Sequence, residues 1–431
     1  MAAQSVLNAG DYDLLVDVGY SIDAFTLDDP LRGLLNSTTY VLDGTTTFSS
    51  VIDGTTSIRV KRGRQDTTDT NAVGTMTFVL DDTRAGGVFN PFDDDPSNPY
   101  YDQAQGVPGL APGRAVQLIR NDDLGNPEKL FVGIVANYDL QFPLGGKTSV
   151  TVLCADNLYR LAQTSVSAYT PPVELAGDRI NDLLDLPEVD YPTGSARSIA
   201  TGTVNLGDYP ISEGTNAKAY VDQIMQTAEF GRFFVARDGV LTTQNRIGTT
   251  LSNPSVVFSD TGSNTPYSDL SIAFDADDIV NRVNVTPVGG ITETADDAGS
   301  QTLYYVRTFD ISNSLLDQQT DAQDLADFLL SPEPEPRFTA VETPFRRLTA
   351  TQRDAVAALD IGDTIEITRT IPTGNTTTVI TQELSVEGLE HTIDISAGHT
   401  VRLYTAPTTI VYPLELDDPL RGILDADNAV A

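Results

Sequence analysis

Hydrophobic and polar residues alternate along much of this chain, as they do in strands that bury one face. Apolar positions two residues apart are Ile58 and Val60; Met76, Phe78 and Leu80; Val116 and Leu118; and Val150 and Val152. The pattern returns at 281–286, 304–309, 364–368, 392–395 and 400–403. It predicts a compact antiparallel barrel or sandwich over about 48–161 and a second strand-rich half.

Helical patterns are fewer, and strands surround them rather than alternate with them. Asp178 is placed to cap a helix that ends before Pro187. Residues 217–230 predict a second helix. Capping boxes, in which Gln follows Thr by three residues, predict two more helices at Thr320–Gln323 and Thr349–Gln352. The arrangement favours a β-rich α+β fold over a doubly wound parallel sheet.

The charge balance narrows the range of partners. The chain has 61 acidic and 26 basic residues, a formal net charge of −35. Such a surface repels a phosphate backbone, so we expect no stable binding of nucleic acid. Two explanations of the acid excess stay open. One is adaptation to a salty environment, and the other is a negatively charged channel through which DNA passes without sticking.

No sequence motif indicates a nucleophile elbow, a phosphate-binding loop or a zinc-protease helix. The single cysteine, Cys154, excludes an intrachain disulfide framework and any multi-cysteine zinc site. We expect neither a secretory signal nor stable membrane insertion, because no apolar run approaches the length that a bilayer requires. The prediction is therefore a protein that is not an enzyme and holds no cofactor.

The two histidines form one weak candidate for a metal site. His391 and His399 lie eight residues apart and flank a predicted hairpin, so they can meet across strands. A metal ion would need further ligands, for which Glu387, Glu390 and Asp394 are the candidates. We favour local hydrogen bonding, because polar residues near a turn usually satisfy one another.

A second weak candidate is the acidic loop at 90–101. Asp93 and Asp95 belong to a run of three aspartates, and calcium prefers several oxygen ligands. The spacing is not that of an EF-hand, because Asn98 stands where glycine belongs and Ala104 stands where the closing glutamate belongs. We favour a solvated acidic loop over a calcium site.

One short segment is basic, which is unusual in so acidic a chain. It contains Arg59, Lys61, Arg62 and Arg64. Strand alternation places Arg59 and Lys61 on the face opposite Ile58. The segment is a candidate contact with an acidic surface of a neighbouring subunit, where it would give register and specificity. A charged strand face with no partner is the alternative.

A nine-residue segment occurs twice, near opposite ends of the sequence, and eight of its nine positions are identical. Asp before Pro and a following Gly suit one helical or tight turn that presents leucines to a partner. The docking candidates are Leu27, Asp28, Asp29, Pro30, Leu31, Arg32, Gly33 and Leu35, and then Leu416, Asp417, Asp418, Pro419, Leu420, Arg421, Gly422 and Leu424.

A series of motifs resembles the hub, or tail-associated, minor tail proteins of long-tailed phages and related archaeal viruses. In chain order the motifs are Phe25–Asn36, Ile58–Arg64, Met76–Asp82, Phe89–Phe92, Ser97–Tyr101, Pro112–Val116, Leu130–Val135, Gly231–Gly239, Asn281–Val285, Leu359–Asp363 and Val386–His391. No single motif is diagnostic. Their order over most of the chain carries the resemblance.

The resemblance implies two tail-tube-like antiparallel β-barrels with smaller mixed α/β insertions, and three chains in a pseudo-sixfold ring. On that template the predicted parts are an N-terminal arm at 1–47, a first barrel at 48–165, a mixed domain at 166–270, a second barrel with a helical insertion at 271–405 and a C-terminal arm at 406–431.

The implied function is that of a structural hub at the distal end of a virion tail. It would adapt a sixfold tube to a threefold tip and line the channel for genome ejection. The implied partners are two further copies of the chain, a distal tail protein or tube ring, the tape-measure protein, tip or receptor-binding proteins, and DNA in transit. A trimer with two docking turns per chain would offer six turns to a sixfold neighbour, with Arg32 and Arg421 pairing to carboxylates.

Two other classes of protein stay as alternatives. A secreted or surface adhesin or sheath protein of a salt-adapted microbe suits the low lysine and high aspartate content, but the expected lack of a signal segment weighs against it. A carbohydrate-active enzyme ranks third, because among so many carboxylates some pair will have a catalytic spacing. Specific cleavage of a polysaccharide would reveal it.

Overall fold

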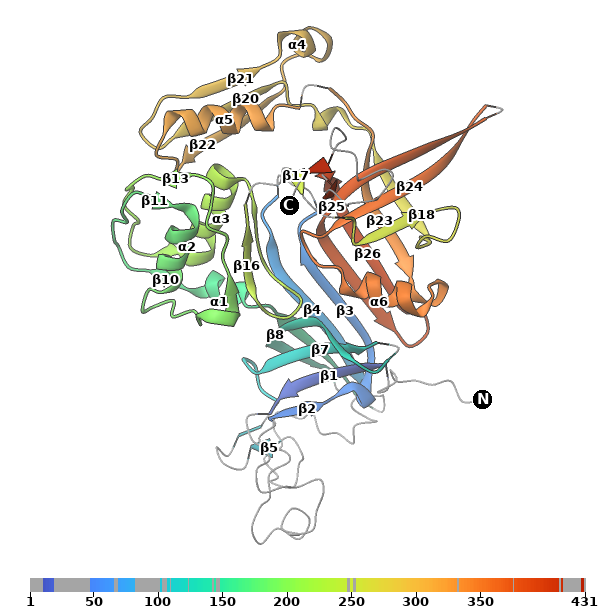
Figure 1. Ribbon diagram of the computed structural model, residues 1–431. Coiled ribbons are helices and arrows are strands. Elements are labelled where there is room, and N and C mark those ends of the chain that lie inside the picture. The colour runs from blue at the N-terminus through green and yellow to red at the C-terminus, as the bar shows by residue number, and fades with distance from the viewer. Residues whose placement is uncertain are drawn as a thin grey trace.

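The computed structural model describes residues 11–18, 47–65, 69–81, 101–102, 107–108, 110–122, 124–141, 143–144, 148–245, 249–250, 253–331, 333–374, 376–410, 412–413 and 428–429. Long strands run through the middle of the molecule, and the mixed domain, which contains α1, α2 and α3, lies against one side of them (Figure 1). A smaller unit of strands and helices lies above that domain in the same view.

One sheet of 13 strands is the largest element. Its strands are β1 (Tyr12–Asp17), β2 (Phe48–Ser50), β3 (Thr55–Gly63), β4 (Ala72–Asp81), β7 (Ala115–Asn121), β8 (Pro127–Gln141), β9 (Ser149–Ala155), β18 (Val256–Ser259), β19 (Asp269–Ala273), β23 (Arg337–Pro344), β24 (Thr364–Thr373), β25 (Thr376–Asp394) and β26 (Gly398–Pro407). The main path is β19-β23-β26-β25-β3-β4-β9-β8-β7-β1-β2, and β24 and then β18 branch from β25.

The predicted alternation holds in the central strands. Ile58 and Val60 on β3 and Phe78 on β4 are buried, and they belong to one apolar core. That core also contains Phe131 from the first half of the chain and Phe338 from the second. The β-rich α+β class is therefore confirmed.

The expected pair of separate β-barrels is not found, because the described strands form no closed barrel. Instead β3 pairs antiparallel with β25, from Ser57 opposite Asp394 to Gly63 opposite Gly388, and joins the two halves into one sheet. Alternation in a sequence shows which face of a strand is buried, but it does not show which strand lies next to it. The alternation pattern therefore could not predict that β3 pairs with β25.

Two glycines permit this join. Gly63 has φ +83°, and a Cβ there would lie 2.3 Å from the Glu387 carbonyl oxygen. A Cβ on Gly388 would lie 2.4 Å from the Arg64 carbonyl oxygen. Neither contact distance is available to a residue with a side chain, so glycine is required on both strands where they meet.

A second apolar core lies within the mixed domain. The helices there are α1 (Leu158–Gln163), α2 (Ala176–Leu184) and α3 (Ala217–Ile224), which continues as one π-helical segment, η3 (Met225–Glu229). The strands are β10 (Ser165–Val166), β11 (Glu174–Leu175), β12 (Arg197–Ser198), β13 (Asn205–Leu206), β14 (Thr215–Asn216), β15 (Arg232–Val235) and β16 (Leu241–Gln244). The predicted helix at 217–230 is thus α3 plus its π-helical end. Asp178 lies inside α2, whose N-cap is Leu175, so the predicted cap was wrong.

The helical insertion shares this second core. It consists of β20 (Arg282–Pro287), β21 (Glu293–Asp296), α4 (Ala298–Tyr304), β22 (Thr308–Ser314) and α5 (Gln319–Leu329), and α5 packs on β20 and β21. The N-cap of α5 is Gln318 rather than the predicted Thr320. The capping box of α6 (Ala350–Ala358), between Thr349 and Gln352, is present as predicted.

The remaining described elements are short. They are β5 (Tyr101–Asp102), β6 (Val107–Pro108), β17 (Thr249–Thr250), β27 (Thr409–Ile410), β28 (Tyr412–Pro413), β29 (Asn428–Ala429), and the 3-10 helices η1 (Ile52–Gly54), η2 (Gly194–Ala196), η4 (Ala276–Asp278) and η5 (Phe345–Arg347). Within the ranges that the structure describes, no helix has the length and apolar character needed to cross a bilayer.

Candidate functional site

The basic segment on β3 divides into an exposed part and a buried part. Arg59 and Lys61 face solvent, and Arg59 pairs with Glu390 on β25 at 2.7 Å. Arg62 and Arg64 are buried at the end of β3, where the sheet meets the mixed domain. The proposed contact with another subunit therefore rests on Arg59 and Lys61, because contacts within the chain engage the other two arginines.

Arg64 belongs to a buried ion cluster around Glu387, which has no exposed surface. Its Nε donates to Glu387 at 2.9 Å, and Arg232 on β15 donates to the same carboxylate through Nε at 3.1 Å and through Nη2. Burial alone would raise the pKa of Glu387, but Arg232 and Arg64 outweigh it and hold that pKa below its usual value. The cluster therefore contains two cations and one anion, and it ties β3, β25 and β15 together.

Arg62, two residues before Arg64, makes a second connection between β3 and the mixed domain. Its Nη1 donates to Asp360 at 2.7 Å and to the Val235 carbonyl at 3.2 Å. The backbone N–H of Arg237 donates to the other oxygen of Asp360 at 2.7 Å. One carboxylate thus links β3 to the turn after β15, so the junction between the sheet and the mixed domain is built from charge-assisted bonds.

Asp156, just after β9, is buried at the same junction. It accepts hydrogen bonds from the backbone N–H groups of Gly74 at 2.7 Å and Leu158 at 2.9 Å. Burial raises its pKa to about 7, against the lowering effect of these bonds and of Arg62 and Lys218. The carboxyl therefore fixes the start of α1 against β4.

The two histidines meet across β25 and β26, as their spacing predicts. Nδ1 of His391 lies 3.0 Å from Nε2 of His399, and Nδ1 of His399 lies 3.0 Å from the Tyr12 hydroxyl on β1. Burial lowers the pKa of His391 to about 3 and holds that of His399 well below its usual value. Both rings are therefore neutral near pH 7, and they connect β1 to the second half of the sheet by hydrogen bonds.

The side chains considered as further metal ligands have other partners. Glu387 and Glu390 bind arginines, and Asp394 accepts from Ser396 in the turn between β25 and β26. The described residues contain no group of three or more His, Cys, Asp or Glu that could hold a metal ion. Asp93, Asp95 and both predicted docking segments, 27–35 and 416–424, lie outside the described residues.

The solvent face of the sheet carries a row of charged residues, one from each of five adjacent strands. The row is Asp269, Glu342, Arg402, Glu390 and Lys61, on β19, β23, β26, β25 and β3. Arg402 lies 3.4 Å from Glu342 and 4.0 Å from Asp269. Cross-strand pairs of opposite charge stabilise one register of the strands. This face of the sheet is polar, whereas the opposite face packs into the apolar core.

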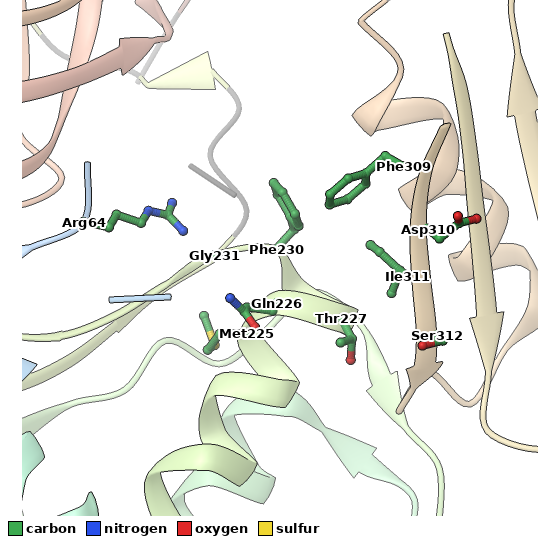
Figure 2. Close-up of a pocket in the computed structure, with 10 residues that line it drawn as sticks. All are labelled: Arg64, Met225, Gln226, Thr227, Phe230, Gly231, Phe309, Asp310, Ile311 and Ser312. Carbon is green, nitrogen blue, oxygen red and sulfur yellow. The ribbon is translucent and has the colours of Figure 1, made fainter. Parts of the chain in front are cut away.

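A cleft lies between the mixed domain and the helical insertion, with a volume of about 240 Å³. Figure 2 shows Phe230 and Phe309 on its two sides, with the guanidinium of Arg64 directed toward it. The two aromatic rings meet edge to face, with centroids 6.5 Å apart. The other residues that line the cleft are Met225, Gln226, Thr227, Gly231, Asp310, Ile311 and Ser312.

Sequence patterns alone do not reveal this cleft, because its walls come from three distant segments. One local feature marks it. Phe230, the residue after the π-helical segment, has φ +50°, a left-handed conformation that is rare for an aromatic residue. Backbone strain of this kind persists only where the surroundings fix it, and it is more common at functional sites.

No protein-family model and no curated protein matches the sequence. Among solved structures, the chain is similar to the tail protein from Neisseria meningitidis MC58, with a TM-score of 0.53 and 13% identity over 92% of this chain and 96% of that one. It is also similar to the 43 kDa tail protein of prophage MuSo2 from Shewanella oneidensis, with a TM-score of 0.51 and 12% identity over 84% of this chain and 95% of that one. The chain has the fold of these tail proteins.

This tail-protein fold extends over nearly the whole of both chains in the first comparison. The mixed domain and the helical insertion are therefore parts of the shared fold, together with the large sheet. The resemblance noted in the ordered sequence motifs is thus supported at the level of the fold.

Proposed function

We propose that the chain is a structural protein of a virus tail tip, a baseplate hub that joins a sixfold tail tube to a threefold tip. The observation that carries this proposal is the fold shared with a tail protein over 92% of this chain and 96% of the other. The polar solvent face of the sheet also suits a wall along a water-filled passage. In this role the chain has no catalytic activity.

In the proposed assembly, three chains form a ring whose lumen admits the tape-measure protein and passing DNA. Two features of the sheet support a ring. Among the described strands, β2 and β19 are the two ends of the main path, so each has one edge open to pairing with another chain. Arg59 and Lys61 add two exposed cations beside Glu390, on a chain of strongly negative net charge.

The repeated turns at 27–35 and 416–424 are the proposed contacts with the neighbouring ring, which would be a distal tail protein or the end of the tube. Three chains offer six such turns, which matches a sixfold neighbour. Each turn would insert leucines into a groove, while Arg32 or Arg421 pairs with a carboxylate.

The location of the chain tests this proposal. In virus particles that carry it, gold-labelled antibodies against the chain are expected at the end of the tail far from the capsid. Label on the capsid or along the whole tube would contradict a hub. Label on the surface of uninfected cells would instead support the adhesin or sheath alternative.

A further inference from the structure

The cleft between η3 and β22 ends at a positive charge that lacks a full set of partners. Arg64 is 7% exposed, and its Nη2 has no hydrogen-bond partner among the described residues. Its Nε is taken by Glu387 and its Nη1 by the Asp69 carbonyl at 3.2 Å. Arg232 shares the Glu387 carboxylate, so two buried cations have one anion between them. Two buried cations that share one anion leave an excess positive charge, and an anion in the cleft would offset it.

The walls of the cleft are polar in part, and their apolar part is formed by Met225, Phe230, Phe309 and Ile311. Phe309 and Ile311 point into it from β22, whereas Asp310 points away and accepts from Asn284 on β20 at 2.7 Å (Figure 2). Phe230 stands opposite them, with Met225 nearby. A ligand for this site therefore needs an apolar group next to an anionic one.

The size and the edge of the cleft indicate a peptide segment rather than a cofactor. A volume of about 240 Å³ is below the usual range of small-molecule sites, which begins at about 300 Å³. The strand β22 is the last in the order β21-β20-β22, so within the described residues one of its edges has no strand beside it. An extended segment can bind along such an edge and place one or two side chains in the cleft.

We propose that, in the free chain, the cleft holds the C-terminal copy of the repeated segment, with a leucine packed against the edge-to-face pair of phenylalanines and an aspartate on Arg64. Residues 414–427 contain Glu415, Asp417, Asp418, Asp425 and Asp427 against a single Arg421, and Leu416 and Leu420 flank the aspartate pair. This segment provides the apolar group and the anion that the cleft lacks.

The path of the chain places this segment within reach. The short strand β27 pairs with β17, and β17 begins five residues after the end of β16. A Cβ on Gly231, in the cleft wall, would lie 2.1 Å from the Gln244 carbonyl oxygen at that end of β16. From Ile410, the end of β27, to Leu416 is six residues, which span up to about 20 Å when extended.

The N-terminal copy starts from a different place. The N–H of Val18 donates to the Thr47 carbonyl at 2.8 Å, so the segment that contains this copy leaves and returns beside β1 and β2. Figure 1 shows β1 and β2 at the bottom of the view and β22, in its separate three-stranded sheet, at the top. The two copies therefore share a composition but differ in their access to the cleft, which gives the experiment a matched control.

The proposal goes beyond the hub function, because it concerns the free chain rather than the assembled ring. Its test uses the full-length chain at low concentration with a pair of new cysteines. The native Cys154 is buried, and burial raises the pKa of its thiol far above the usual value, so it does not compete. The test pair is Gln226→Cys in the cleft wall with Asp418→Cys in the C-terminal copy. The control pair is Gln226→Cys with Asp29→Cys, the equivalent position in the N-terminal copy.

The expected result is a disulfide within one chain for the test pair and none for the control pair, read by non-reducing electrophoresis and by mass spectrometry of the linked peptides. A disulfide requires the two Cβ atoms to come within about 4.5 Å, so it reports occupation of the cleft. No link, a link between chains, or equal linking in both pairs would overturn the proposal.

A second variant tests the chemistry of the cleft. Phe309→Asp, added to the test pair, is expected to reduce linking at least tenfold, because it puts a carboxylate where the leucine side chain binds. Phe309→Leu keeps an apolar wall and is expected to preserve linking. Equal linking in both variants would overturn the assignment, and loss of ring assembly alone would bear only on the hub function.

Discussion

At the scale of single residues, the structure assigns opposite roles to members of one basic segment. Arg59 is exposed beside Glu390, whereas Arg64 lies in a buried cluster with Glu387 and Arg232. Exposed ion pairs contribute little to stability, because water screens them and the side chains lose freedom on pairing. Breaking a buried pair is strongly destabilising, because removal of one partner leaves a charge that water cannot reach.

Glu387→Gln should therefore destabilise the protein strongly. The substitution leaves Arg64 and Arg232 buried without an anion, and we expect the free energy of unfolding to fall by about 3–5 kcal/mol. Glu390→Gln is the matched control on the same strand, with an expected loss below about 1 kcal/mol. Urea unfolding of both variants measures the difference, and equal losses would contradict the assigned roles.

Single residues also show what the sequence could predict. The spacing of His391 and His399 correctly placed them together, because a hairpin brings such positions into contact whatever lies around it. The capping box at Thr349 was correct for the same reason, since all its atoms are within four residues. The caps at Asp178 and Thr320 were wrong by a few residues, because strand and loop contacts fix where those helices begin.

At the scale of elements, the join of β3 with β25 makes one sheet from the two halves of the chain. Alternation in β3 and β4 was visible in the sequence, and so was the β-rich character of both halves. The partner of β3 was not, because the partner strand lies more than 300 residues away along the sequence. The cleft was also invisible, since Arg64, Phe230 and Phe309 have no shared pattern.

Gly63→Ala is expected to break this join. The new Cβ would approach the Glu387 carbonyl oxygen to 2.3 Å at a residue with φ +83°, so steric conflict adds to backbone strain. We expect a loss of about 2–5 kcal/mol in the free energy of unfolding.

Gly125→Ala is the matched control for this substitution. Gly125 has the same φ of +83°, and a Cβ there would have no atom within 4 Å. Strain alone should cost about 1–2 kcal/mol. Thermal unfolding compares the two variants, and a loss for Gly125→Ala as large as that for Gly63→Ala would show that steric contact at the join is unimportant.

At the scale of the whole molecule, the chain has the fold of known tail proteins. This fold combines the large sheet, whose described end strands have open edges, with the mixed domain and the helical insertion. The carboxyl groups of Glu387, Asp360 and Asp156 hold the sheet against the mixed domain. Symmetry and neighbours are properties of an assembly. A single sequence does not show them, and the repeated segment at 27–35 and 416–424 is only the basis of a prediction.

Electron microscopy of the purified full-length chain, together with its native mass, tests the central claim most directly. The hub function predicts closed rings with threefold symmetry, a central opening and the mass of three chains. Single chains at every protein and salt concentration, or open filaments without a defined number of subunits, would contradict it.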